Sequence, residues 1–485
     1  MNKKLVLYNS GKIAVFTSFL MLLPAIVSLI YRDGQLISFM IPFAIMLSIG
    51  ILCTRFKPKN KQAYAKEGFV TVALMWLVLS AFGSLPFVIS GEIPSFVDAF
   101  FETVSGFTTT GSSVLTDVEA LSQSMLFWRS FTNWVGGMGV LALAIAILPS
   151  DKRSESAKDG SVHILKAESP GPTFGKLVSK LKYNVRILYL IYTVMTALEF
   201  VLLLFGGMSI FDSMLASFST AGTGGFAIKN AGIAYYNSAY VDYVIGIFML
   251  LFGVNFNIYY FMLTGKLLKI LRSEELRWYL VIVATAVVSI TLNILSQFES
   301  FATAFRYAFF QVSSIVTTTG FATANYDLWP TFSKFILFLL MFTGACASST
   351  AGGFKISRVI ILFKSAICEI RNHINPREVH TVKCDDTYLT PVTVAGVGTY
   401  FAIYMGIIFL SSLIIALDGE SFATTFSSAV SCLNNIGPGF EKVGAVGNYS
   451  EFSVLSKLVL SFNMLAGRLE ILPLLIAFSP SVWKK

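Results

Sequence analysis

The chain has 485 residues, of which 55% are hydrophobic and only 13% are charged, and its mean hydropathy is +0.71. Soluble globular proteins carry about 25% charged residues, so this composition excludes a soluble enzyme. The formal net charge of +9 comes from short Lys and Arg clusters between apolar runs, which membrane topology explains better than nucleic-acid binding. We therefore predict an all-α polytopic membrane protein.

Ten apolar runs are long enough to cross a bilayer, for which a helix needs about 20 residues. The five cysteines are widely spaced without a CxxC pair, which indicates neither a disulfide framework nor a metal site. The predicted spans are residues 12–31, 36–54, 68–90, 126–148, 186–206, 239–264, 278–296, 333–363, 393–416 and 454–479.

Basic residues concentrate in every second loop. By the positive-inside rule, the segments at 55–61, 152–186, 265–272 and 355–383 and both termini are cytoplasmic. The outer side then holds seven basic and fourteen of the 27 acidic residues, and therefore a net charge of −7. An acidic vestibule that attracts cations and a passive result of topology explain this excess equally well.

Four outer loops share one pattern, a short apolar segment that ends thirteen residues later at a glycine. Loops of this length with apolar content are expected to re-enter the membrane. In the second loop Gly224 competes with Gly225, and we prefer Gly225 because it keeps the interval and is followed by Phe, as Gly320 is. The aligned segments are DAFFETVSGFTTTG (98–111), DSMLASFSTAGTGG (212–225), YAFFQVSSIVTTTG (307–320) and TTFSSAVSCLNNIG (424–437).

These segments have the chemistry of a cation filter. A cation that loses its water needs oxygen ligands, and glycine lets backbone carbonyls turn toward a pore. The threonines before the glycine add hydroxyl groups, and the short helices can direct their negative C-terminal ends at the axis. One Thr-Thr-Thr-Gly alone would indicate a turn, but four copies in register favour a filter. The fourth copy has Asn434, Asn435 and Ile436 before its glycine, which predicts a less regular ring of carbonyls.

Two features lie below this predicted filter. The eighth run is interrupted by GACASSTAGG (344–353), and irregular backbone in a membrane must be buried in protein or line a cavity. Close helix packing through small residues is the alternative. Arg468 lies fourteen residues into the last run, about 21 Å deep at 1.5 Å per residue.

A charge at that depth costs at least about 2.5 kcal/mol unless it faces a cavity or a partner. We expect Arg468 to face the permeation path as a positive barrier and latch, with loop carbonyls as partners, whereas Glu470 cannot share its helix face. Glu199 is a second deep charge whose partner the sequence does not name. Lys355 and Arg358 are either a gate hinge or positive-inside anchors.

The four segments, together with FTGACASSTAGGFKISR (342–358) and NMLAGRLEILPLL (463–475), resemble the Trk/Ktr superfamily of potassium transporters, and most closely its Trk-type membrane subunit, over essentially the whole chain. The resemblance implies a two-helix extension at 1–66 and four helix–pore loop–helix repeats around one pore, at 67–150, 183–272, 276–372 and 390–485. One glycine per repeat (Gly111, Gly225, Gly320 and Gly437) would select potassium over sodium.

Related plant members with serine at the first position tend to pass sodium, so Gly111 favours potassium. The TVGYG signature of potassium channels is absent from all four copies, which predicts looser selectivity. Carried onto this chain, the filter comprises Thr109, Thr110, Gly111, Thr223, Gly224, Gly225, Thr318, Thr319, Gly320, Asn435, Ile436 and Gly437, with K⁺ contacts from Thr109, Thr110, Thr318, Thr319 and Asn435.

The resemblance also makes the interrupted eighth run a gate that crosses the pore below the filter. K⁺ is then the transported ion, and no organic cofactor is expected. The implied assembly is a homodimer in the bilayer of a bacterial inner (plasma) membrane, docked on a cytoplasmic nucleotide-binding regulatory ring through basic segments such as 152–186 and 364–383. The gate residues are Gly344, Ser348, Ser349, Thr350, Gly352, Gly353, Lys355 and Arg468.

Three other functions are less consistent with the sequence. ATP-driven pumping needs a GxxxxGK[ST] phosphate loop, which the chain lacks. A membrane-embedded hydrolase needs His, Asp or Glu clusters on facing helices, whereas His163, His373 and His380 fall in predicted loops. A secondary transporter for a small organic solute with broken helices is the main alternative, but it predicts two repeats rather than four. Both a channel and a proton- or sodium-coupled symporter fit the pattern.

Overall fold

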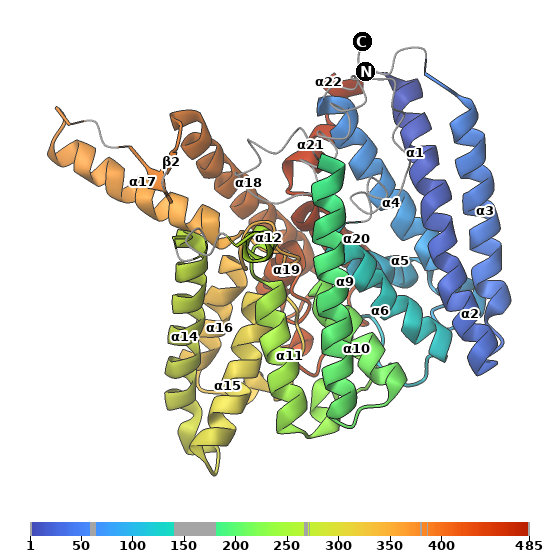
Figure 1. The fold of residues 1–485 in the computed structure, drawn as a ribbon, viewed down its shortest axis with the longest axis horizontal. Helices are drawn as coiled ribbons and strands as arrows, with labels where there is room; N and C mark the ends of the chain where they lie inside the picture. Colours follow the sequence, from blue (N-terminus) through green and yellow to red (C-terminus); the bar gives the residue numbers. More distant parts are fainter. Residues whose placement is uncertain are drawn as a thin grey trace.

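The computed structural model describes residues 2–58, 65–139, 181–265, 270, 272–378, 381–385 and 387–483. Six helices in this part of the chain are long and apolar enough to cross a membrane, or seven if one strongly bent pair is counted as a single span. The long helices stand side by side, and α1 begins at the same end of the molecule at which α22 ends (Figure 1). The basic segment predicted at 152–186 lies almost entirely outside the described residues.

The N-terminal part is a pair of packed helices. α1, η1 and α2 form one span of 29 residues, which begins nine residues earlier than the sequence predicts. Gly11 and Gly50 let this span approach α3 closely, since a Cβ on Gly11 would lie 2.8 Å from the carbonyl oxygen of Gly50. The elements are α1 (Lys3–Ser18), η1 (Phe19–Met21), α2 (Leu22–Tyr31) and α3 (Leu36–Arg55).

The next two units each place a short helix between longer ones. The predicted span at 126–148 is described only as far as residue 139. The elements are α4 (Ala65–Ser90), α5 (Phe96–Phe107), α6 (Gln123–Gly137), α9 (Leu181–Phe205), α10 (Ile210–Gly222), η3 (Gly232–Tyr236), α11 (Ala239–Phe252) and α12 (Phe256–Leu263).

In the C-terminal half a short helix follows a long one twice more, and a small hairpin is added, in which Lys383 pairs with Tyr388 and Cys384 with Thr387. This hairpin corrects the all-α expectation. The elements are α14 (Glu274–Ile294), η4 (Leu295–Gln297), α15 (Phe301–Val316), η5 (Tyr326–Leu328), α16 (Thr331–Thr343), α17 (Ile356–Ile374), β1 (Lys383–Cys384), β2 (Thr387–Tyr388), α18 (Pro391–Ile415), η6 (Ala416–Asp418), α19 (Phe422–Asn434), η7 (Glu441–Val443), α20 (Val454–Arg468), α21 (Leu472–Phe478) and α22 (Pro480–Trp483).

The short helices α5, α10, α15 and α19 begin in the same way. In each, a serine precedes the helix and its hydroxyl accepts a hydrogen bond from the backbone N–H three residues later. At 12 to 16 residues they reach about 18–24 Å at 1.5 Å per residue, too short for a hydrocarbon core of about 30 Å. The four caps are Ser95, Ser209, Ser300 and Ser421.

Three predicted spans are broken in the structure. The span predicted at 239–264 is not continuous, because α11 and α12 meet at 89°. The span predicted at 333–363 is interrupted, as expected, and α17 then leaves the bundle sideways (Figure 1). The span predicted at 454–479 breaks after Arg468, since Glu470 and Ile471 have φ of +62° and +53°, which no α-helix accommodates.

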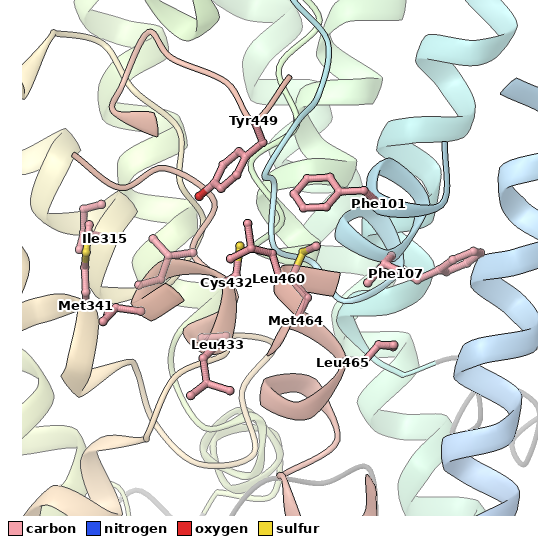
Figure 2. Close-up of a cluster of buried hydrophobic side chains, with 14 of the residues drawn as sticks. Phe101, Phe107, Ile315, Met341, Cys432, Leu433, Tyr449, Leu460, Met464 and Leu465 are labelled. Atoms are coloured by element: carbon pink, nitrogen blue, oxygen red, sulfur yellow. The ribbon is translucent and has the colours of Figure 1, made fainter. Parts of the chain in front are cut away.

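An apolar core joins the short helices to one another. Figure 2 shows side chains from α5, α15, α19 and α20 gathered in one region, with the ring of Tyr449 facing that of Phe101 at 5.5 Å between centroids. Because these residues come from distant parts of the sequence, the core fixes the C-terminal ends of the short helices relative to one another. The labelled members are Phe101, Phe107, Ile315, Met341, Cys432, Leu433, Tyr449, Leu460, Met464 and Leu465.

Candidate functional site

All four short helices end in the same backbone turn. The residue two positions before each aligned glycine has a φ of +54° to +57°, and the next N–H bonds back to the carbonyl of a serine, at 2.8 to 3.0 Å. A left-handed conformation is unusual for threonine, so these turns store strain that the surrounding packing must hold. The left-handed residues are Thr109, Thr223, Thr318 and Asn435, and the serines are Ser105, Ser219, Ser314 and Ser431.

The four aligned glycines form a closed ring. A Cβ built on Gly111 would collide with the carbonyl oxygen of Gly224, one on Gly225 with that of Thr319, one on Gly320 with that of Ile436, and one on Gly437 with that of Thr110. Each glycine therefore faces the residue before the glycine of the next segment. All four have positive φ, and the register runs through Gly225, since Gly224 does not share this conformation.

Four of the five side chains predicted to contact the cation make hydrogen bonds within the protein, namely Thr110, Thr318, Thr319 and Asn435. The hydroxyl of Thr110 lies 2.8 Å from that of Thr108, and the hydroxyl of Thr319 lies 2.8 Å from that of Thr317. The amide of Asn435 donates to Thr110 Oγ1 at 3.0 Å and to the carbonyl of Met464 at 2.9 Å. The asparagine of the fourth segment thus ties the first segment to α20.

A buried ion pair holds the chain where it leaves the first two glycines. Arg129 Nε lies 2.8 Å from Glu102 Oε1, and both side chains are at most 2% exposed. Arg129 also donates to the carbonyl of Ala227 at 3.0 Å, while Glu102 accepts from the N–H of Val114 at 2.9 Å. Both residues belong to the charges that the topology places on the outer side of the membrane. A signal for their pairing was present, because an ionisable residue inside a re-entrant helix needs a partner.

The segment at 344–355 is irregular, buried and anchored on several sides. The N–H of Cys346 donates to the carbonyl of Gly253 at 3.1 Å, and the N–H of Phe256 donates to the carbonyl of Ser348 at 3.1 Å. The loop therefore fills the corner at which α11 bends into α12. Glu275 Oε1 of α14 accepts from the N–H of Ala347 at 2.7 Å. These bonds satisfy backbone groups that lipid could not satisfy.

Arg468 bridges this loop and the end of α6. Its guanidinium donates to the carbonyl of Thr350 at 2.8 Å, to that of Gly137 at 2.6 Å and also to that of Gly136. A cavity of about 90 Å³ adjoins it on one side of the loop. Its lining includes Ser348, Gly352, Lys355, Asn257, Arg468 and Glu470.

The other charges near the loop have separate partners. Glu470 forms an ion pair with Arg358, whose guanidinium lies 4.0 Å from the ring centroid of Tyr400. Arg358 is thus a buried partner rather than a surface anchor. Lys355, 1% exposed and with φ of +75°, donates to the carbonyl of Ala351 within the loop. Glu199 is completely buried on α9 beside Thr220 of α10, without an ion pair in the described residues.

Part of the predicted outer acidic charge is neutralised locally. Lys457 pairs with Asp98 at 2.6 Å, and Arg306 lies 3.4 Å from Asp242. Lys442 contacts both Glu420 and Glu451, and the hydrogen bonds that its ammonium donates to these two carboxylates raise the pKa of Lys442. Local structure therefore explains several of the acids that the vestibule interpretation invokes.

The buried pair predicts a strong effect on stability. Glu102→Gln leaves the Arg129 charge buried and uncompensated, which is expected to cost about 3–5 kcal/mol and to lower the thermal unfolding midpoint of the detergent-solubilised protein. Glu420→Gln removes a carboxylate from the exposed pair with Lys442 and should leave the midpoint nearly unchanged. Equal midpoints for the two variants would contradict a structural role for the Glu102–Arg129 pair.

Residues 36–485 match the TrkH family, whose members are described as cation transport proteins. The chain is 36% identical over 482 residues to the Trk system potassium uptake protein TrkH of Salmonella typhimurium, with 98% of each chain covered. It is 33% identical over 490 residues to TrkG of Escherichia coli, with 99% of each covered. The crystal structure of the potassium transporter TrkH from Vibrio parahaemolyticus aligns over 100% of both chains with a TM-score of 0.89 and 31% identity. The chain therefore belongs to the TrkH family of cation transport proteins.

Proposed function

We propose that this protein carries potassium into the cell through a single pathway surrounded by four helix–pore loop–helix repeats. The closed ring of four glycines and neighbouring carbonyls carries the proposal, because such a ring offers a dehydrated cation oxygen ligands from all sides. The names of the relatives and of the matched crystal structure support potassium as the ion. The N-terminal helix pair α1–α3 lies outside the four repeats.

The filter selects among cations by the spacing of its backbone carbonyl oxygens. Each repeat contributes a left-handed residue, one intervening residue and a left-handed glycine, so the carbonyls from Thr109 to Gly111 and their equivalents line the pathway. The hydroxyls of Thr109 and Thr318 and the amide oxygen of Asn435 stand at the inner end. The hydrogen bonds of Thr110, Thr319 and Asn435 make their side chains supports of the backbone in addition to the K⁺ contacts that the resemblance implies.

The gate is the loop at 344–355 with Arg468 as its latch. Gly344 and Gly353 reach positive φ without strain, but Ser348 and Lys355 also have positive φ, so the loop holds two unfavourable residue conformations that its partners maintain. The glycine pair Gly352–Gly353 places the loop against the filter, and Arg468 adds a positive charge that repels cations. The hydroxyls of Ser349 and Thr350 hold the loop in shape, since they donate to the carbonyls of Cys346 and Phe252. Withdrawal of the loop opens the pathway.

The small cavity beside the gate favours an ion over an organic solute. Sites for small organic molecules usually occupy about 300–1,000 Å³, whereas the cavity that Arg468 lines measures about 90 Å³. No group of three His, Cys, Asp or Glu residues within the described ranges could hold a metal ion. The relatives are described as cation transport and potassium uptake proteins, so transport rather than an enzymatic reaction is the proposed activity.

The proposed assembly follows the family resemblance. Two copies form a homodimer in a bacterial inner membrane, with the termini and the hairpin β1–β2 on the cytoplasmic side. A nucleotide-binding regulatory ring docks there, near α17, which carries Lys364, Arg371 and the exposed His373. The positive-inside pattern of the loops supports this orientation.

The first experiment is rubidium uptake into proteoliposomes that contain the purified chain, with potassium or sodium as competitor. Gly320→Ser places a Cβ against the carbonyl of Ile436 and 2.7 Å from Pro438 Cδ, so we expect the preference for rubidium over sodium to fall at least about tenfold, or about 1.4 kcal/mol. Gly207→Ser is the matched control, because Gly207 has the same φ of +84° but nothing within 4 Å. Unchanged selectivity in Gly320→Ser would contradict the filter.

Removal of the latch should raise the leak. Arg468→Ala loses the bond to Thr350, and a hydrogen bond from a charged donor contributes about 1.5–3 kcal/mol, so basal rubidium flux without a regulatory partner is expected to rise at least about tenfold. Arg277→Ala, on an exposed part of α14, controls for the loss of a charge. A normally folded Arg468→Ala protein with unchanged or lower flux would overturn the latch.

A further inference from the structure

The gate loop touches the filter through one buried hydrogen bond. The N–H of Gly352 donates to Thr318 Oγ1 at 2.7 Å, and both residues are buried. A Cβ on Gly353 would lie 3.6 Å from Thr318 Cγ2, and one on Gly352 would collide with the carbonyl of Asn434. The glycine pair therefore packs directly against the inner ends of the third and fourth filter segments.

The four positions equivalent to Thr318 have different side-chain partners. Thr223 Oγ1 donates to the carbonyl of Gly222 at 2.6 Å. Thr109 Oγ1 and Asn435 Oδ1 are buried without a hydrogen-bond partner among the described residues. All four share one backbone conformation, but within the described residues Thr318 is the one whose side chain bonds to the gate loop.

We propose that the Thr318 hydroxyl couples the gate to cation binding in the filter, an inference that rests on the function proposed above. With the loop in place, the N–H of Gly352 takes a lone pair of the Thr318 oxygen. When the loop withdraws, this oxygen becomes free to act with the partnerless oxygens of Thr109 and Asn435 as a ligand at the inner end of the filter. Because coupling is reciprocal, a cation bound there favours withdrawal of the loop.

Electrostatic repulsion between the cation and the N–H of Gly352 explains why they compete for the Thr318 oxygen. A threonine oxygen has two acceptor lone pairs, and a cation and a peptide N–H both approach it with positive charge. Two positively charged partners at one oxygen repel each other, so each is expected to weaken the binding of the other. The strained turn at Thr318 holds the oxygen in place for both partners, since its φ of +57° is fixed by the bond from Thr319 N–H to Ser314.

Loop withdrawal can be measured at Cys346, which lies in the gate loop and is 0% exposed. The test is the rate at which N-ethylmaleimide modifies Cys346 in the full-length purified protein, followed by mass spectrometry of the peptide, in potassium and in sodium. In the unmodified protein we expect potassium to raise this rate. Arg468→Ala should raise the Cys346 modification rate in both salts. This variant therefore gives the rate expected when the loop is released.

Thr318→Val keeps the shape of the side chain but removes the acceptor. We expect it to raise the Cys346 rate about three- to tenfold in sodium, as loss of one hydrogen bond predicts, and to abolish the difference between the salts. Thr318→Ser keeps the oxygen and should behave as the unmodified protein does. Thr109→Val removes the equivalent hydroxyl without touching the loop, so it should weaken rubidium uptake but leave the Cys346 rate in sodium unchanged.

Two results would overturn the coupling. One is a Thr318→Val protein that reacts at the unmodified rate, and the other is a Thr109→Val protein that reacts as fast as Thr318→Val. Either result leaves the proposed function intact if rubidium uptake still depends on Gly320. If rubidium uptake did not depend on Gly320, the proposed filter itself would be contradicted, whatever the Cys346 rates show.

Discussion

Close approach of four backbones around one centre is the constraint on which the rest of the structure depends. Each aligned glycine lies against the carbonyl that precedes the next glycine, so a side chain at any of the four would displace a neighbour as well as its own strand. The turns that deliver these strands are strained, because three of them place a threonine in the left-handed region. Serine caps at the helix starts, serine carbonyls at the helix ends and the apolar core then hold the turns.

The backbone of the four segments is alike, but their side-chain surroundings are not. Glu102 and Arg129 join the exits of the first two segments, whereas the fourth segment is tied through Asn435 to Thr110 and to α20. Within the described residues, the third segment is the one whose side chain bonds to the proposed gate loop, at Thr318. If the ring is the filter and the loop its gate, as we propose, the backbone ligands are similar on all four sides while contact with the gate is confined to one side.

The sequence was sufficient to find the four segments, their glycines and the interruption at 344–353, because each has a local signature in spacing or small-residue content. It was insufficient where long-range contacts decide the structure. The bend between α11 and α12 depends on carbonyl and amide partners in the gate loop, which no local pattern reveals. The helix breaks after Arg468, and Glu470 in this break pairs with Arg358, which lies 112 positions earlier in the sequence. Glu102 and Arg129 were counted among the outer charges because a residue's place in the predicted topology does not indicate whether its side chain is buried.

In the gate proposed above, the position of Arg468 would let a buried latch release at a small energetic cost. α6 ends at Gly137, and the last carbonyls of a helix have no partner within it and carry its negative dipole end. Arg468 donates to the carbonyls of Gly136 and Gly137 there, and to Thr350 of the loop with another nitrogen. When the loop withdraws, the guanidinium keeps its two carbonyl partners on α6. Opening therefore costs about one charged hydrogen bond rather than an uncompensated buried charge, which would cost several kcal/mol. A barrier of this size lies within the range that a bound cation or a docked partner can shift.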